Sequence, residues 1–316
     1  MEHVRLLADK TLHNPVMVFA FTGWNDAGEA ASAAVRTMVT HWGASLLAEI
    51  DPEPFTDFAT VRPSVFIRGG QRQIAWPTVQ VWAASLPGAD AILVLGPEPA
   101  LQWRLFSEQI VALAEYLHVS MTISLGALLA DVPHTHPVHV IGTASDPELM
   151  DRFDLKQSTY EGPTGIVGVL HDMLGGSDIS SASLWATVPG YTAQIPSPKA
   201  CEALMRTACS MIGTAVPVGA FANAVADYEA RVAALVADDD ELASYVSRLE
   251  TMMADDDDDD DSDADDDITE DVTRLDGGDA DSDVEVDSEQ FLAEVERFLR
   301  DSGPPTGDGP QADPTR

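Results

Sequence analysis

The sequence predicts an α/β fold, a mostly parallel sheet with helices on both faces, followed by a C-terminal helical segment. Apolar runs of strand length recur through residues 16–188 and are mostly continuous rather than alternating, as in strands that are covered on both faces. Helical patterns separate several of these runs. Alternation of strand and helix is typical of a layered α/β domain with a parallel sheet.

Each expected element follows from its local pattern. Strands are expected at the β-branched-rich apolar runs Val16–Phe21, Ala44–Ile50, Val79–Ala83, Ala91–Leu95, Met121–Leu125, Val138–Ile141 and Ala182–Val188. Helices are expected at Gly28–Trp42, Arg104–Leu117, Gly165–Leu174 and Pro198–Ile212. Val61–Trp76 holds two short strand-like runs around Arg68-Gly69-Gly70-Gln71, which predicts a hairpin inserted at one edge of the sheet.

Beyond this domain, apolar residues from Val225 to Leu249 follow a spacing of three and four that is broken at Asp239. The pattern fits one long helix with a weak point, or a helical hairpin whose second helix is capped by Asp238 or Asp239. Its apolar seam packs either on the chain's own domain or on a subunit or partner. The predicted organisation is an α/β domain (1–220), a helix or helical hairpin (221–253), a disordered acidic linker (254–287), a short amphipathic helix (288–301) and a disordered tail (302–316).

Charge excludes some classes of partner. The 316 residues contain 53 Asp and Glu against 17 Lys and Arg, and residues 255–316 alone hold 25 acidic and 4 basic residues. A nucleic-acid binder needs a large basic patch, so nucleic acid is not an expected partner. The N-terminus shows no signal-peptide pattern and no run is long and apolar enough to span a membrane, so a cytoplasmic protein without membrane contact is expected.

The cysteine spacing argues against a disulfide. Cys201 and Cys209 lie in one helical pattern, which would place their Cα atoms about 12 Å apart. They are expected to be reduced core thiols.

Three tryptophans, Trp42, Trp82 and Trp103, together with the apolar seam, indicate more apolar surface than one domain hides, so a homo-oligomer is expected.

The turn after the first strand is the clearest candidate for a ligand or partner cleft. Gly23, Trp24, Asn25 and Asp26 connect a strand end to a helix start, where unpaired N–H groups can bind an anion in an open parallel sheet. Asp26 followed by Glu29 also resembles a capping box, which would occupy those same donors. Both interpretations follow from the residues.

A second glycine-rich helix start, Gly162-Pro163-Thr164-Gly165 after Tyr160, lacks the Lys and Ser/Thr of a phosphate-binding loop. The glycines and the proline of this segment fit either of two interpretations, close packing of the chain at the helix start or a ligand site. Glu98 follows the Ala91–Leu95 strand. It is expected either to lie at the rim of a cleft or to be an ordinary surface residue of the loop.

Other chemistry has little support in the sequence. The cluster His134, His136 and His139 could begin a metal site, but no cysteine or carboxylate pattern completes it, and we expect no metal and no cofactor. No nucleophile elbow, zinc-protease helix or kinase signature occurs. We therefore assign no catalytic residues.

Five segments, in order, resemble one known family: Gly23–Ala31, Val94–Pro99, Ser124–Val138, Tyr160–Asp172 and Ser183–Ala200. The chain is similar to the proteasome assembly chaperone 2 (PAC2) family in its actinobacterial form. The resemblance implies an α/β fold akin to nucleoside phosphorylase/hydrolase-like domains, self-association often as a trimer, and a chaperone role in assembling proteasome rings. It implies no catalytic set.

The expected function is therefore that of a non-enzymatic, proteasome-assembly-chaperone-like protein that contacts itself and proteasome subunits or another protein client. The alternative is a small-ligand-binding protein or enzyme with a nucleoside-phosphorylase-like cleft. The candidate cleft comprises Gly23, Trp24, Asn25, Asp26, Glu98, Tyr160, Gly162, Thr164, Gly165 and Tyr191.

Overall fold

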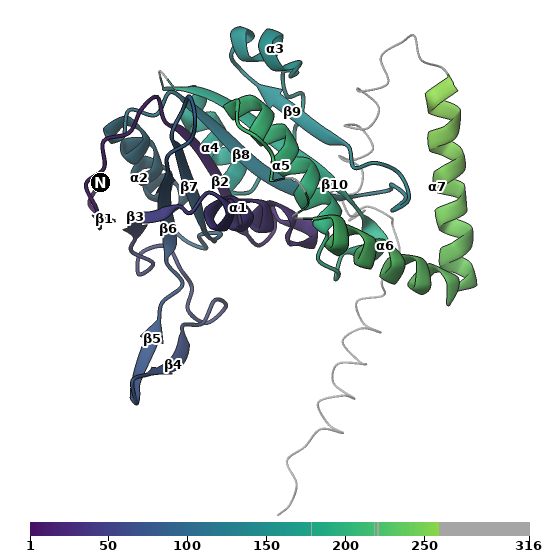
Figure 1. Ribbon diagram of the computed structural model, residues 1–316, viewed down its shortest axis with the longest axis horizontal. Coiled ribbons are helices and arrows are strands. Elements are labelled where there is room, and N and C mark those ends of the chain that lie inside the picture. Colours follow the sequence, from purple (N-terminus) through teal and green to yellow (C-terminus); the bar gives the residue numbers. More distant parts are fainter. Residues whose placement is uncertain (178, 218, 220, 259–316) are drawn as a thin grey trace, which may run out of the picture. The chain divides into compact units, whose positions relative to one another are not determined.

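The computed structural model describes residues 1–177, 179–217, 219 and 221–258 (Figure 1). The short amphipathic helix predicted at 288–301, the tail at 302–316 and most of the predicted acidic linker lie outside these residues.

An eight-stranded mixed sheet forms the centre of the described chain, in the order β1-β3-β6-β7-β2-β8-β10-β9. Its four central strands pair in parallel: β7 (Ala91–Pro97), β2 (Val16–Thr22), β8 (Met121–Ala130) and β10 (Ser180–Pro189). Antiparallel strands complete both sides: β1 (Val4–Leu6), β3 (Ser45–Ile50), β6 (Val79–Ala84) and β9 (Val140–Ala144). The predicted parallel arrangement thus holds for the centre, where buried strands carry continuous apolar runs.

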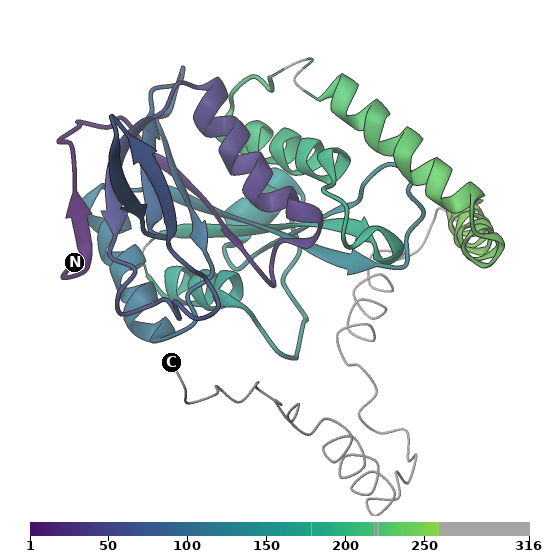
Figure 2. The same ribbon diagram turned by 90° about the horizontal axis from the view of Figure 1, so that it is seen from below.

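Helices cover both faces of the sheet, as predicted. Figure 2 shows α1 (Ala30–His41) and α5 (Pro198–Ile212) on one side, and α2 (Trp103–Tyr116) and α4 (Ile166–Gly175) on the other. The alternation within β2 explains the two cores, because Val18 packs in the α1–α5 cluster whereas Phe19 packs in the α2–α4 cluster. A short helix, α3 (Pro147–Phe153), follows β9 and has no counterpart among the predicted elements.

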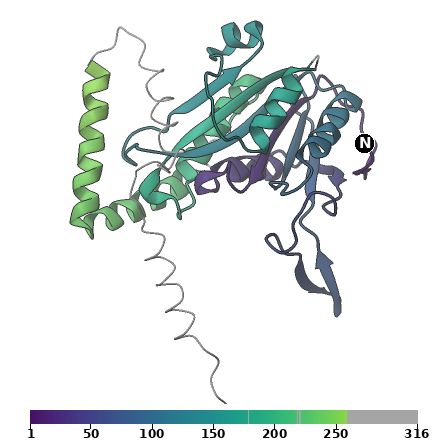
Figure 3. The same cartoon turned by 180° about the vertical axis from the view of Figure 1, so that it is seen from behind.

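The predicted hairpin at Val61–Trp76 is present, but it does not join the main sheet. Its strands, β4 (Ser64–Arg68) and β5 (Gln71–Ala75), pair only with each other. Figures 1 and 3 show them projecting beyond the sheet. The placement at one sheet edge was wrong, because the flanking segments leave the sheet before β4 begins and return only at β6.

Two helices follow the α/β domain, so the apolar pattern from Val225 belongs to a pair rather than one long helix. They are α6 (Ala222–Ala237) and α7 (Asp240–Asp258), which meet at a steep angle (Figure 1). The carboxylate Oδ1 of Asp239 accepts hydrogen bonds from the backbone N–H groups of Glu241 and Leu242, at 3.0 and 3.1 Å. Asp239 therefore caps α7, as the hairpin alternative predicted.

The apolar core contains several of the groups that the sequence singled out. Cys201 and Cys209 are buried free thiols, and burial raises the pKa of Cys201 to about 12. Trp42 and Trp82 pack against the α1–α5 core and Trp103 against the α2–α4 core. These three tryptophans therefore do not supply the surplus aromatic surface on which the expected self-association was partly based.

Candidate functional site

The turn after β2 is held by hydrogen bonds at the carboxyl ends of three parallel strands. Asn25 is 1% exposed, and its carbonyl accepts a hydrogen bond from the N–H of Ala127 on β8 at 2.9 Å. Its side-chain Nδ2 donates to Oε1 of Glu98, which follows β7, at 2.7 Å. Residues far apart in the sequence therefore meet here because parallel strands end at the same edge.

Glu98 and Gly165 complete this arrangement. The same Oε1 of Glu98 accepts the N–H of Ile166 at 2.9 Å, so the Glu98 carboxylate satisfies the N-terminus of α4. Gly165 lies so close that a Cβ built on it would be 2.2 Å from Oδ1 of Asn25. Four predicted site residues, Gly23, Asn25, Glu98 and Gly165, are thus neighbours, and the anion position at this helix start is filled by the chain's own carboxylate.

Asp26 performs the same task for α1. Its Oδ1 accepts from the N–H groups of Ala31 and Ser32, at 2.9 and 3.0 Å. Burial raises the pKa of Asp26, although these hydrogen bonds act in the opposite direction. The geometry agrees with the capping interpretation but differs in detail, because the N–H of Glu29 bonds to the Asp26 carbonyl rather than to its side chain. Gly28 and Glu29 both adopt positive φ, which turns the chain into the helix.

An open groove of about 860 Å³ lies beside this edge; we call it the strand-end groove. Predicted site residues Gly23, Trp24, Asp26, Tyr160 and Thr164 line it. Trp24 is 54% exposed and forms part of its wall. The volume lies within the range of small-molecule sites, roughly 300–1,000 Å³.

The groove also contains residues that the sequence did not bring forward. His171 on α4 lies on its wall with Ser183 and Trp185 on β10. Burial lowers the pKa of His171, and its Nδ1 lies 3.1 Å from the hydroxyl of Ser181. A Cβ on Gly126 would stand 2.5 Å from the Trp185 ring, so the ring packs directly on β8. The glycine inside the β8 apolar run was the available signal.

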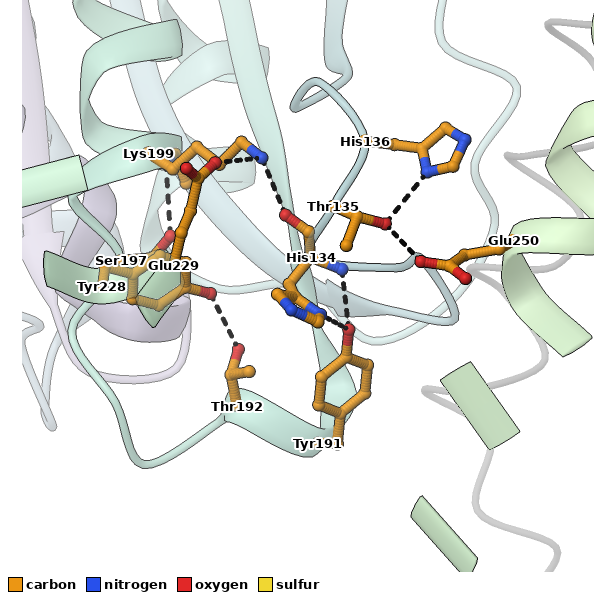
Figure 4. Close-up of polar contacts among 11 residues, drawn as sticks. His134, Thr135, His136, Tyr191, Thr192, Ser197, Lys199, Tyr228, Glu229 and Glu250 are labelled. Carbon is orange, nitrogen blue, oxygen red and sulfur yellow. Dashed lines mark hydrogen bonds and ion pairs between the residues drawn. The ribbon is translucent and has the colours of Figure 1, made fainter. Parts of the chain in front are cut away.

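Two predicted residues, Gly162 and Tyr191, belong neither to the Asn25–Glu98 contact nor to the lining of the groove. A Cβ on Gly162 would meet the Tyr160 hydroxyl at 2.6 Å, so this glycine fits the tight loop before α4. Tyr191 belongs to a different cluster. Its hydroxyl accepts the N–H of His134 at 2.7 Å and lies 2.9 Å from the ring Nδ1 of the same histidine (Figure 4).

The Tyr191 cluster fastens α6 and α7 to the α/β domain. Lys199 at the start of α5 donates to the His134 carbonyl at 2.7 Å and pairs with Glu229 of α6 at 2.9 Å (Figure 4). The Thr135 hydroxyl donates to Glu250 of α7 at 2.7 Å. The loop that the sequence considered for a metal thus serves as a docking point for the C-terminal helices.

Apolar and aromatic contacts support the same docking. Tyr228 and Val232 of α6 are buried against Ile195, and the rings of Tyr191 and Tyr245 meet edge to face at 6.2 Å. The Tyr245 hydroxyl donates to Asp131. Part of the predicted seam therefore packs on the chain's own domain, while Leu235 remains 47% exposed.

Among the described residues, no three His, Cys, Asp or Glu side chains gather closely enough to hold a metal ion. Within the same residues, no helix combines the length and apolar character needed to cross a bilayer.

Comparisons with known proteins agree with the fold. The sequence model described as "PAC2 family" matches residues 20–236. A PAC2 family protein from Streptomyces avermitilis is 42% identical, with a TM-score of 0.68, over 73% of this chain and 99% of that one. A proteasome-assembly chaperone homologue from Mycobacterium tuberculosis is 38% identical, with a TM-score of 0.66 and the same coverage. Pyrococcus furiosus PbaB, an archaeal proteasome activator, shares the fold at 14% identity and a TM-score of 0.60, over 73% and 97% of the two chains. No curated protein sequence matched.

Proposed function

The chain belongs to the PAC2 family, and from this membership we propose that it is a proteasome-assembly-chaperone-like protein that acts through protein–protein contacts. The observation that carries the proposal is the similarity to the Mycobacterium tuberculosis proteasome-assembly chaperone homologue, which is covered over 99% of its length. The PAC2 family model matches residues 20–236, which include the turn after β2, α4 and α5.

The chemistry at the strand ends supports a non-enzymatic role. Three of the polar side chains that the sequence nominated, Asn25, Asp26 and Glu98, each hydrogen-bond to a backbone N–H group or to another of these three side chains. Glu98 satisfies the N-terminus of α4 and Asp26 that of α1. Groups committed to such bonds stabilise the fold and are poorly placed to transfer protons to a substrate.

The proposal includes the finer features expected from the family. The protein self-associates, as a homotrimer, works in the cytoplasm, and contacts proteasome subunits as clients. A reducing compartment is consistent with the two buried free thiols, Cys201 and Cys209.

An assembly assay tests the chaperone role. Purified proteasome α and β subunits from the source organism are mixed with and without the protein, and ring formation is followed by native gel and by peptidase activity. Faster appearance of complete rings is expected. An equally acidic unrelated protein serves as the control, since it reproduces the charge without the fold. Identical assembly kinetics with and without this chain would contradict the proposal.

The strand-end groove favours a second candidate, a small-ligand-binding function. Its volume of about 860 Å³ and the polar groups of His171 and Ser183 beside Trp185 suit a small polar ligand. Native mass spectrometry of the protein purified from its source under mild conditions tests this idea. A stoichiometric added mass that a Trp185→Ala variant loses supports ligand binding; a bare mass for both proteins counts against it.

A further inference from the structure

The β4–β5 hairpin, here called the arm, exposes apolar side chains that a hairpin cannot hide by itself. Every residue of both strands is exposed. The pairing places Val65 opposite Ile74 and Ile67 opposite Arg72, so these four side chains share one face. Val65, Ile67 and Ile74 are 51%, 76% and 51% exposed. Since a lone two-stranded hairpin is marginal in water, this face is built to be covered.

The arm is also basic in an acidic chain. Residues 58–89 contain no Asp or Glu and three arginines, Arg62, Arg68 and Arg72. Residues 1–254 as a whole carry 28 acidic and 13 basic residues, which leaves 28 acidic against 10 basic outside this segment. An apolar and basic arm is therefore complementary to the rest of its own chain.

The strand-end groove has the matching character. Trp24 and Leu129 on its walls are 54% and 40% exposed. The carboxylates of Glu29 and Asp154 lie on it, against one lysine, Lys156. An exposed apolar surface whose charged lining residues are mostly acidic suits an apolar strand pair that carries arginine at its tip.

The arm and the groove of one chain do not meet, because none of the residues that line the groove belongs to the arm. Contact between two arms that point in the same direction is disfavoured, since it would bring Arg68 and Arg72 of one copy against the same arginines of the other. Each strand of the arm has five residues, which gives a length of about 17 Å, enough to reach into a neighbouring molecule.

We propose that the arm of one copy docks into the strand-end groove of a second copy. The inference rests on the proposed self-association and names its surfaces. Such a contact joins two different patches, so it is heterologous and closes into a ring when its rotation permits, as a trimer requires. The groove is then completed by a neighbouring chain.

Single variants provide the first test, with molecular mass measured by light scattering and sedimentation across a concentration series. Ile67→Asp on the arm and the double variant Trp24→Ala/Leu129→Ala in the groove should each weaken association by about 30-fold or more, the loss typical of an interface anchor. Leu235→Asp is the matched control, because Leu235 is an exposed apolar residue of α6 outside both surfaces. Circular dichroism establishes that each variant is folded.

Mixing the two defective proteins provides the second test. The Ile67→Asp protein keeps an intact groove and the Trp24→Ala/Leu129→Ala protein keeps an intact arm. Combined, they should form a dimer with one productive contact, although each alone is monomeric. This complementation also excludes misfolding as the cause of the monomeric state.

The outcomes separate the two proposals. A monomeric wild-type protein overturns self-association and the arm contact together. If the wild type is oligomeric and the Ile67→Asp variant has the same molecular mass, the arm contact alone is overturned. The same conclusion follows if Leu235→Asp dissociates the oligomer while Ile67→Asp has no effect. Two monomeric variants that do not combine on mixing overturn the pairing of arm with groove.

Discussion

Gly165→Ala is expected to destabilise the protein strongly, although Gly165 has an ordinary negative φ of −92°. The new methyl group would stand 2.2 Å from Oδ1 and 2.5 Å from Nδ2 of Asn25. Asn25 is buried and cannot turn away without breaking its bond to the charged Glu98. Overpacking and the loss of that bond together cost about 2–5 kcal/mol.

A double-mutant cycle isolates the clash. In an Asn25→Ala background the obstructing amide is gone, so Gly165→Ala should cost only about 0.5–1 kcal/mol, the preference for Gly over Ala at an N-cap. Gly175→Ala is the matched control in the same helix, because its nearest neighbour is Oγ of Ser145 at 3.8 Å. That change should be neutral or stabilise by up to about 1 kcal/mol.

Urea unfolding, followed by circular dichroism and extrapolated linearly, measures the free energy of unfolding of the four proteins of the cycle and of the Gly175→Ala control. The reasoning fails if Gly165→Ala lies within about 0.5 kcal/mol of the wild type, or if its effect adds to that of Asn25→Ala without coupling.

Three further predictions concern the caps, the histidines and α7. Asp26→Ala should lower the free energy of unfolding by about 1–2 kcal/mol. Asp26→Asn keeps a hydrogen-bond acceptor for the N-terminus of α1, so its free energy of unfolding should stay within about 0.5 kcal/mol of the wild type. Equal losses for the two variants in urea unfolding would contradict the capping role. Burial lowers the pKa of His134 and His171 in the folded protein. Below pH 6.5 the unfolded chain therefore binds more protons than the folded protein, so the free energy of unfolding should fall as the pH drops from 6.5 through the folded pKa values. The double change to Asn should flatten this part of the stability curve, and an unchanged slope in pH-dependent unfolding would refute the assignment. Tyr245→Phe removes the bond to Asp131 and should raise hydrogen exchange in α7 by about tenfold without affecting the central strands; equal protection in both proteins would show that the bond does not hold the helix.

Much of the fold is determined by local patterns in the sequence. The runs at Val16 and Ala91 are continuous and apolar because β2 and β7 are covered on both faces, so they are recognisable as buried parallel strands. The Asp239 cap was foreseen as one of two alternatives, since the break in the apolar spacing coincides with a good N-cap residue. The family membership also follows from the sequence, because five short segments that resemble the family occur in the same order along the chain.

Only the tertiary structure decided what those residues contact. Asn25, Glu98 and Gly165 are separated by many residues, and their hydrogen bonds depend on which strands become neighbours in the sheet. The hairpin sequence predicted its own pairing, but strand periodicity does not state whether a hairpin joins a sheet or stands free. Likewise Tyr191 was selected as a cleft residue, whereas the fold places it against His134 beside α7. Local sequence fixes backbone preference and which face is apolar, while the partner of each face is set by long-range packing, which no single segment encodes.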